Sequence, residues 1–543
     1  MSVEVQPGKD NAWTSERFLI WLLWTTGICF TLGLQLSRTD EVFYTGDAGV
    51  KTLMVRQFAA GAWQADLQLD ADPWIRHLWD QGLYPLGPPF VYEVDGARFI
   101  QYPLFFPALT APFYVLFGFR GLTILPLIGL WLIWGFFLIA CRRCGFDSVS
   151  MAFGFAGLVF ASPLTLYSAM FTEHTLAVGL SFAGFTLAMM PETRTVSRRQ
   201  SLFAGLLMGI AFWLRPESSV YILGSFVALM GINKGSRLHL LQVAIAAAIP
   251  IVLYVGMNAW LFDSSLGFHH IQRYAPNQEY PDMPSMKIAA HLIEKLFYYY
   301  PILPALLGVF LIALLVRPGR RLVGDPPARH ERSIWVGVLV FCLVSVFLLP
   351  NDGGKQYGPR YWSHLIPWLW LLATARFAAL RMAKTQMAYF LMAVLVALTA
   401  TGMWLSTVKG SRGVFVNYRE RTLPALKLVR QMKADVVVVS HQWISQELQA
   451  AFETAPFVRV RTGLEFLSLV QGMAAEKRTK LLWFGLRPHQ KSSGRKDGLA
   501  WRFSSPKPIG EYFVSAGSVW SIDEPEDDNI NDASDNAGNS PEK

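Results

Sequence analysis

The sequence predicts an all-α polytopic membrane domain followed by a small α/β domain, and three observations lead to this prediction. The 543 residues are 52% hydrophobic and only 16% charged, which is too apolar for a soluble chain of this length. Apolar runs of about 15 to 25 residues recur along most of the chain, close to the length that crosses a hydrocarbon core of about 30 Å. Near the C-terminus, short strand-like and helix-like stretches alternate instead.

The first apolar run sets the expected orientation. Phe18 to Leu36 is longer than the apolar core of a secretory signal, and no small-residue cleavage pattern follows it, so we expect it to stay as an anchor. Residues 1–17 are polar and contain Lys9 and Arg17, which favours a cytoplasmic N-terminus. The loop 37–102 is therefore expected on the extracytoplasmic side of the membrane.

Basic clusters between the apolar runs support this topology. The formal net charge is +9, but the positive residues are spread over several short connections rather than pooled in one patch, which argues against nucleic acid as the partner. We interpret the following clusters as cytoplasmic loops: Arg142 and Arg143; Arg194, Arg198 and Arg199; Lys234 and Arg237; Arg317, Arg320, Arg321, Arg329 and Arg332; Arg376, Arg381 and Lys384.

About eleven transmembrane spans result from this reading. The run 102–119 contains three prolines. If this run is re-entrant or interfacial, the later basic loops all lie on the cytoplasmic side, where positive residues are expected. The runs 202–214 and 220–232 are short, so each crosses fully or dips in and returns. The spans are Phe18–Leu36, Leu122–Ala140, Ser150–Ser168, Thr175–Met190, Leu202–Leu214, Val220–Ile232, Leu240–Phe262, Ile293–Val316, Ile334–Pro350, Trp362–Ala378 and Met387–Thr407.

Domain boundaries follow from the change in composition. The membrane domain covers 18–408, and 409–522 is expected to be an extracytoplasmic α/β domain. The tail 523–543, rich in Asp, Asn, Ser and Glu, is expected to be disordered. Strands are predicted at Asp435–Ser440, Leu481–Phe484 and Tyr512–Trp520, and helices at Trp443–Phe452 and Glu465–Glu476. Because no G-x-S-x-G turn is present, Ser440-His441 favours a helix cap over a hydrolase site.

Asp47 is the first candidate functional residue. It lies between Gly46 and Gly49, directly before a stretch, 48–63, whose apolar spacing predicts a helix along the membrane surface. Asp47 is either the cap of that helix or a carboxylate that faces a substrate carried by the lipid.

Further candidates occupy short external turns between spans, where charged groups are expensive and therefore often functional. Each has a structural alternative: a solvated turn for Glu173 and His174, an ion pair for Arg215 and Glu217, and contact with lipid headgroups for Lys355 and Arg360. Against the last alternative stands the glycine-rich turn 351–361, which also contains Tyr357 and lets backbone amides approach an anion.

Metal binding is not clearly encoded. His269 and His270 have no carboxylate nearby at ligand spacing, and the Cys141 to Cys144 pair has Arg-Arg between its cysteines and no second pair of ligands. The sequence therefore assigns no metal ligand, and it leaves open a requirement for a divalent metal.

These residue types suit one kind of reaction. Lys355 and Arg360 suit a phosphate leaving group, and Asp47 suits a general base that deprotonates an incoming hydroxyl or amine. Displacement at a sugar carbon by such a pair is an inverting glycosyl transfer.

Longer motifs resemble the GT-C superfamily. These are TGDAGVK, the proline-rich run QYPLFFPALTAPFYVLFGFRGL, SPLTLYSAMFTEHT, GLLMGIAFWLRPE and GGKQYGPRYWSHLIPWL, within residues 15–410. They look like bacterial protein O-mannosyltransferase-like and aminoarabinose-transferase-like enzymes that use polyprenyl-phosphate sugars. The resemblance implies a hexosyl or pentosyl transferase of the cell envelope. It places Asp47 as the base, Glu173 as a second acid near the acceptor or a metal, and Lys355 with Arg360 at the lipid phosphate.

The implied partners are a polyprenyl-phosphate sugar and a lipid, glycan or protein acceptor, at the outer face of the inner membrane. Tyr357, Arg215, Glu217 and His174 are expected to bind substrate. The C-terminal domain is expected to recognise the acceptor or to serve as a packing module. A transporter or flippase for a lipid-linked glycan is the main alternative, although it would favour charges within the spans and two related halves. A noncatalytic scaffold in envelope assembly is a third.

Overall fold

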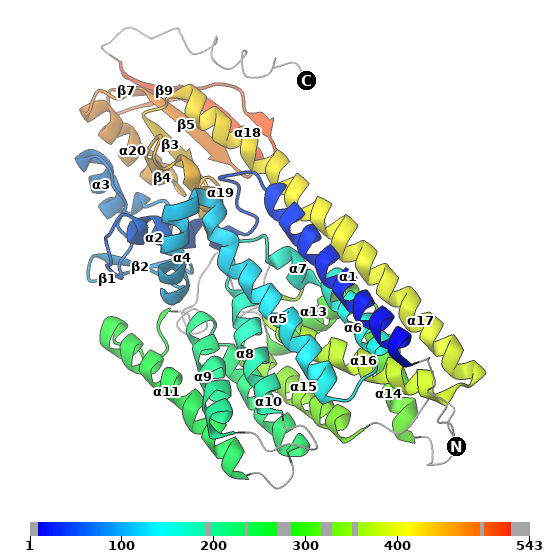
Figure 1. Ribbon diagram of the computed structural model, residues 1–543. Helices are drawn as coiled ribbons and strands as arrows, with labels where there is room; N and C mark the ends of the chain where they lie inside the picture. The colour runs from blue at the N-terminus through cyan, green and yellow to red at the C-terminus, as the bar shows by residue number, and fades with distance from the viewer. Residues whose placement is uncertain are drawn as a thin grey trace, which may run out of the picture. The chain divides into compact units, whose positions relative to one another are not determined.

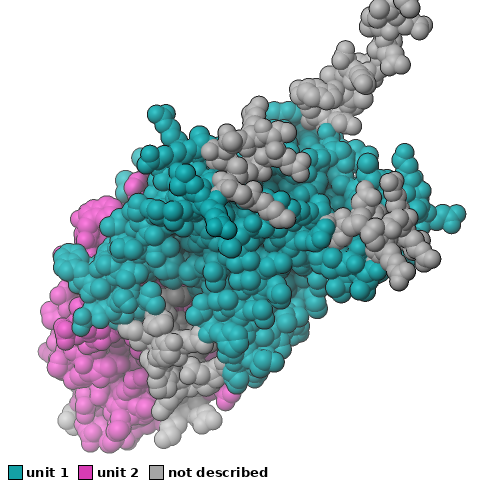
Figure 2. All heavy atoms as spheres, turned by 90° about the horizontal axis from the view of Figure 1, so that it is seen from below, with its two compact units in different colours: residues 1–38, 115–412 teal, residues 39–114, 413–543 magenta. Residues whose placement is uncertain are grey.

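The computed structural model describes residues 9–189, 197–233, 237–268, 284–315, 328–349, 357–488 and 493–522, with side chains from Phe18 onward. The chain forms two compact units, which Figure 2 shows in different colours. Unit 1 contains residues 1–38 and 115–412, and unit 2 contains residues 39–114 and 413–543. Each unit is therefore assembled from two separate stretches of sequence.

Unit 1 is helical (Figure 1). It also contains the short segments η2 (Gly118–Thr123), η3 (Arg360–Trp362) and η4 (Trp404–Gly410). The helices are α1 (Lys9–Leu36), α5 (Ile124–Arg143), α6 (Ser148–Phe160), α7 (Pro163–Tyr167), α8 (His174–Ala188), α9 (Arg198–Leu214), α10 (Ser218–Ile232), α11 (Arg237–Phe262), α13 (Ser285–Tyr299), α14 (Ile302–Leu315), α15 (Arg329–Leu348), α16 (Leu365–Ala383) and α17 (Gln386–Met403).

Six helical stretches of the described chain are long and apolar enough to cross a membrane, and α8, α10 and α6 are shorter apolar helices. The run Ile293–Val316, predicted as one span, is bent, because α13 and α14 meet at an angle of 98°. This bent pair would add a seventh span if it crosses as one unit. The total of about eleven spans stays a prediction.

Glycines allow α8, α9 and α11 to approach closely, and Figure 1 shows α9 and α11 side by side. A Cβ on Gly205 would lie 2.2 Å from the backbone oxygen of Val243, and one on Gly209 would lie 2.5 Å from that of Ala247. On the other side of α9, a Cβ on Gly184 would lie 2.6 Å from the oxygen of Ala204. Small residues at contacts between apolar helices let backbones pack without a hydrophobic driving force.

Unit 2 joins the first loop to the C-terminal domain. The boundaries between the units fall near α4 (Phe105–Phe117) and η5 (Arg412–Val416). The loop contributes α2 (Gly46–Ala59), α3 (Pro73–Leu78), η1 (Trp79–Leu83), β1 (Val91–Val94) and β2 (Ala97–Ile100). The C-terminal part contributes the helices α18 (Asn417–Met432), α19 (Gln442–Glu447), η6 (Gln449–Ala451) and α20 (Gly463–Ala475), and the strands β3 (Val436–Val439), β4 (Phe457–Arg459), β5 (Lys480–Gly485), β6 (Ser493–Lys496), β7 (Leu499–Phe503), β8 (Lys507–Ile509) and β9 (Tyr512–Ser521).

The C-terminal strands form one mixed sheet with the order β4-β3-β5-β9-β7-β6, and β8 pairs with β9. The β3–β4 and β3–β5 pairs are parallel, because α19 and α20 return the chain between successive strands, whereas β9 is antiparallel to its neighbours. The strand Val436–Val439 is fully buried, as its unbroken valine run predicts. The predicted α/β character of this part is confirmed.

The loop segment is fastened to the C-terminal domain by polar and close backbone contacts. Gln442 accepts a hydrogen bond from the Gly87 N–H at 3.0 Å and donates one to the Pro88 oxygen at 2.9 Å. The Trp79 indole donates to the Phe457 oxygen at 2.9 Å. α2 also packs on α19, since a Cβ on Gly49 would lie only 1.9 Å from the Gln446 backbone oxygen.

The helix predicted at 48–63 exists as α2, but its expected place along a membrane surface is wrong. Asp47 to Val55 are all buried, as are Gln57 and Phe58. A surface helix would leave one side exposed, whereas α2 is enclosed on nearly every side.

Candidate functional site

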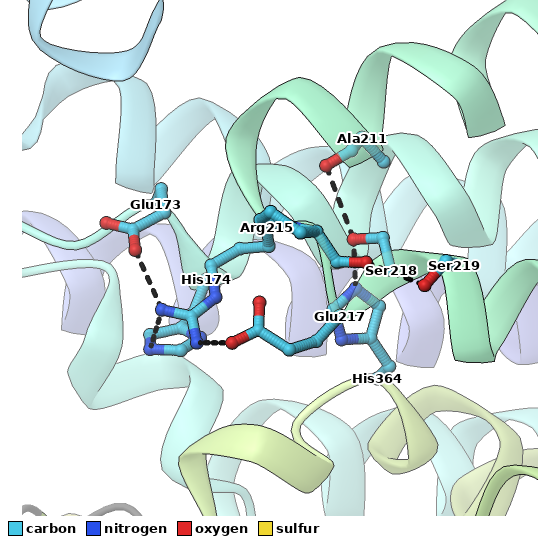
Figure 3. Close-up of polar contacts among 9 residues, drawn as sticks. Glu173, His174, Ala211, Arg215, Glu217, Ser218, Ser219 and His364 are labelled. Carbon is cyan, nitrogen blue, oxygen red and sulfur yellow. Dashed lines mark hydrogen bonds and ion pairs between the residues drawn. The ribbon is translucent and has the colours of Figure 1, made fainter. Parts of the chain in front are cut away.

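A buried cluster of charged side chains lies in unit 1 (Figure 3). Arg215 stands between two carboxylates: its Nη1 is 2.8 Å from Oε1 of Glu173 and its Nη2 is 2.9 Å from Oε1 of Glu217. Nη1 also lies 3.4 Å from Nε2 of His174. Four of the predicted site residues therefore meet at one place.

The connectors between helices bring these residues together. Glu173 and Glu217 are the residues that directly precede α8 and α10, and Arg215 follows α9 in an extended conformation. Both carboxylates thus sit at helix N-termini, where the partial positive charge of the backbone amides favours a negative group. Pro216 does not continue the helix, so the chain turns at Arg215 and brings Glu217 to the other end of the guanidinium.

The cluster is almost completely shielded from solvent. The side chains of Arg215, Glu173 and Glu217 are 5%, 2% and 14% exposed. Burial alone would lower the pKa of Arg215, but the charges of Glu217 and Glu173 outweigh it and raise the pKa above its ordinary value. Arg215 is therefore a permanent buried cation.

A second arginine, Arg360, contacts the same aromatic ring as Arg215 does. The guanidinium of Arg360 lies 5.0 Å from the centre of the Tyr361 ring, and that of Arg215 lies 5.4 Å from the same centre. Both distances allow attraction between the cation and the ring. Tyr361 thus connects the turn that contains Arg360 to the Glu173–Arg215–Glu217 cluster.

The turn before Arg360 is held by tyrosines. The Tyr167 hydroxyl donates to the backbone oxygen of Tyr357, and the Tyr357 hydroxyl donates to the Leu405 oxygen at 3.0 Å. Gly358 has a φ of +76°, and a Cβ there would lie 2.7 Å from the Tyr167 hydroxyl oxygen. This position therefore requires glycine for both its conformation and its space.

His364 directly precedes α16. Its Nε2 is 3.1 Å from the Ser218 hydroxyl oxygen, and its ring packs against Tyr221 with centroids 5.4 Å apart. Burial, and secondly the charge of Arg215, lower the pKa of His364 to about 3. His364 is therefore neutral at physiological pH.

Asp47 belongs to unit 2, in the first turn of α2, and is 8% exposed. Thr45 precedes the helix, but its side chain makes no capping hydrogen bond to α2. One turn further along, Lys51 is 2% exposed, with its Nζ 4.8 Å from the centre of the Tyr102 ring. The meeting of Asp47 with the Arg215 cluster stays a prediction.

Some candidates lie elsewhere. Lys355, His269 and His270 fall outside the described residues. His441 caps α19 by accepting from the Trp443 N–H, as predicted. Sequence reasoning missed Tyr167 and His364, although both lie inside the quoted motifs SPLTLYSAMFTEHT and GGKQYGPRYWSHLIPWL.

The donor set around Arg215 does not resemble a metal site. Both carboxylates of the cluster are engaged by a guanidinium. No group of three or more His, Cys, Asp or Glu side chains is placed to hold a metal ion among the residues that the structure describes. The two carboxylates of this cluster thus pair with an organic cation of the chain itself, the Arg215 guanidinium.

Comparisons with known proteins identify the fold. No protein-family model and no curated protein sequence matches the chain. Among solved structures, ArnT from Cupriavidus metallidurans in the apo state matches with a TM-score of 0.53 and 13% identity over 91% of this chain and 97% of ArnT. ArnT bound to undecaprenyl phosphate matches with a TM-score of 0.51 and 13% identity over 93% of this chain and 98% of that one.

The oligosaccharyltransferase of Archaeoglobus fulgidus in the apo form matches with a TM-score of 0.51 and 11% identity, over 85% of this chain and 69% of that protein. The predicted GT-C fold is confirmed. At these identities the likeness concerns the fold, which includes a small strand-rich C-terminal domain after a mainly helical part.

Proposed function

We propose that this chain is a membrane glycosyltransferase that moves a hexose or pentose from a polyprenyl-phosphate donor to an acceptor with inversion at the sugar carbon. The observation that carries the proposal is the buried Glu173–Arg215–Glu217 cluster, joined to Arg360 through Tyr361, in a chain with the GT-C fold. The ArnT structure with bound undecaprenyl phosphate supports a lipid-linked donor for the shared fold.

In the proposed reaction, Asp47 acts as the general base. Its carboxylate takes the proton of an acceptor hydroxyl or amine, and the freed electron pair attacks the anomeric carbon of the sugar. The bond from that carbon to the phosphate oxygen breaks on the opposite face, and its electrons leave with the lipid phosphate. The anomeric configuration is thereby inverted.

The cations have the task of stabilising the leaving phosphate. Arg360 can donate two hydrogen bonds to phosphate oxygens, and Lys355 is proposed to add a point charge. Tyr357 shares the turn of Arg360 and is proposed to line the same site. Because negative charge grows on the phosphate as the bond breaks, fixed cations lower the barrier most in the transition state.

Glu173 keeps its proposed role as the second acidic residue, near the acceptor. Arg215, Glu217 and His174 are proposed to bind substrate as one unit, since Arg215 contacts each of the other three residues of the cluster. We place the reaction at the outer face of the inner membrane, with a cytoplasmic N-terminus and an extracytoplasmic C-terminal domain. The acceptor is a lipid, a glycan or a protein.

Transfer by purified full-length chain tests this function. The donors are polyprenyl phosphates that carry radiolabelled mannose, glucose, galactose or arabinose, and the acceptor is an envelope extract from a strain that lacks the gene. Asp47→Asn is expected to reduce transfer about a hundredfold to ten-thousandfold, since general-base catalysis contributes roughly 10²–10⁴-fold. The control Asp70→Asn changes an exposed carboxylate of the same loop and should keep full activity. Wild-type activity in Asp47→Asn would contradict the assignment.

A further inference from the structure

A stripe of buried polar side chains lies on the C-terminal domain next to α2. Gln442, Ser445, Gln446 and Gln449 follow one another at the spacing of a single helix face, along α19 and η6. They are 0%, 0%, 1% and 1% exposed. A buried helix face is normally apolar, so this stripe needs an explanation.

The two ends of the stripe differ in hydrogen bonding. Gln442 is satisfied by the backbone of Gly87 and Pro88. Neither amide atom of Gln446 or Gln449 makes a hydrogen bond within the part of the chain that the structure describes, and neither does the Ser445 hydroxyl. Burying such groups without a hydrogen bond costs free energy, and hydrogen bonds to a polar ligand or to a buried water would offset that cost.

The unbonded amides lie beside the first turn of α2. The Gln446 Oε1 atom is 3.0 Å from the position of a Cβ on Gly46, the residue before Asp47, and η6, which begins at Gln449, packs on the same helix. The C-terminal domain thus brings neutral amides next to the backbone of the proposed general base.

The chemistry of the stripe selects a class of ligand. A primary amide donates and accepts hydrogen bonds, as a sugar hydroxyl does, and it has no charge with which to attract phosphate. We infer that Gln446 and Gln449 bind hydroxyl groups of a sugar ring, of the donor or of the acceptor, beside Asp47. This inference rests on the proposed function and gives the C-terminal domain a part in sugar recognition.

The test compares two variants that keep side-chain length but remove the amide. Gln446→Met/Gln449→Met changes the unbonded groups, and Gln442→Met is the matched control on the same face. The probes are polyprenyl phosphates carrying mannose, glucose, galactose or arabinose, the same polyprenyl phosphate without a sugar, and the four corresponding methyl glycosides. Binding is measured on the purified full-length chain, together with its unfolding temperature.

We expect the double variant to bind the sugar-free lipid as the wild type does and to unfold at the same temperature or higher, because no hydrogen bond of the chain is lost. It should bind a sugar probe about tenfold more weakly, the loss expected for one or two hydrogen bonds. Weaker binding of the sugar-bearing lipid identifies the donor sugar, and weaker binding of a methyl glycoside alone identifies the acceptor. Gln442→Met should instead lower the unfolding temperature, because it leaves the Gly87 and Pro88 backbone groups unpaired.

The outcomes separate this inference from the proposed function. If the wild type binds a sugar probe and the double variant binds it equally well, the amides hold buried water only and the inference is wrong. The same holds if the double variant loses stability and binds every probe, including the sugar-free lipid, equally more weakly. A wild type that neither prefers the sugar-bearing lipid nor binds any glycoside overturns the proposed function and this inference with it.

Discussion

Arg215 balances the charge of two buried carboxylates in unit 1. Two carboxylates held together in a buried place repel each other and lack hydration, and the guanidinium between Glu173 and Glu217 compensates both effects. Planar Arg can bond each carboxylate from a different nitrogen, whereas the compact ammonium of Lys could not reach both in the same way.

Arg215→Met is expected to destabilise the chain by about 3–5 kcal/mol, the usual result of breaking a buried ion pair from one side. Adding Glu173→Gln and Glu217→Gln should restore much of that stability while activity stays lost, because no carboxylate is then left uncompensated. The unfolding temperature in detergent and the transfer rate measure the two effects. Arg381→Ala, which breaks an exposed pair with Asp147, should change stability by about 1 kcal/mol or less. Equal losses of stability in Arg215→Met and Arg381→Ala would contradict this account.

Burial of His364 predicts an acid-sensitive fold. With a pKa of about 3, folded His364 stays neutral, whereas the unfolded chain binds a proton below about pH 6.5. The unfolded state therefore binds more protons between these values, so stability falls as the pH drops from 6.5 toward 3. Unfolding temperatures measured from pH 7.5 to 4.5 should fall less steeply for His364→Asn. His77→Asn, at an exposed site, should keep the wild-type slope, and a His364→Asn slope equal to the wild type would refute the explanation.

At the scale of elements, the turn from Tyr357 to Trp362 presents Arg360. Gly358→Ala is expected to displace this turn, since a Cβ would meet the Tyr167 hydroxyl in addition to the strain of a φ of +76°. Binding of a sugar-free polyprenyl phosphate should weaken about tenfold or more. Gly118→Ala is the matched control, because its φ is +57° but no atom lies within 4 Å of a Cβ there, so it carries the strain without the collision. Equal binding by the two variants would show that Gly358 does not position Arg360.

The lengths of the apolar runs predicted most helices of unit 1, because hydropathy reports which residues avoid water. Hydropathy does not report the direction in which a helix runs. The run Ile293–Val316 stays apolar through Tyr300 and Pro301, so the 98° bend between α13 and α14 could not be read from hydropathy. The β1–β2 hairpin was missed although Asp95-Gly96, both at positive φ, is a typical two-residue hairpin turn.

The candidate site was predictable in part. Charged residues in short turns between apolar runs pointed to Glu173, His174, Arg215 and Glu217, and these do meet in the fold. Tyr167 and His364 were missed because a neutral side chain in an apolar motif gives no signal of its own. Their importance comes from long-range contacts with Tyr357 and Ser218, which sequence spacing does not reveal.

At the scale of the whole molecule, sequence order and structural units do not coincide. The loop 39–114 precedes most of unit 1 in sequence but belongs to the same compact unit as residues 413–543. Composition could not predict this grouping, because the loop and the C-terminal domain are separated by about three hundred residues of apolar helices. The segment containing Asp47 therefore depends on a domain at the other end of the chain.

A chain that ends after Arg412 should accordingly fail to order the loop. Without Gln442, Glu453 and Phe457, the loop loses the hydrogen bonds that Gly87 and Pro88 make to Gln442, the ion pair of Arg56 and the hydrogen bond of Trp79. Hydrogen exchange followed by mass spectrometry should then show fast exchange over Gly46–Ala59, while peptides from α8 to α11 keep their protection. A chain that ends after Ile522 keeps these partners and should protect α2 as the full chain does. Slow exchange over α2 in the shorter chain would mean that the loop folds without the C-terminal domain, and that the domain is not needed to hold Asp47.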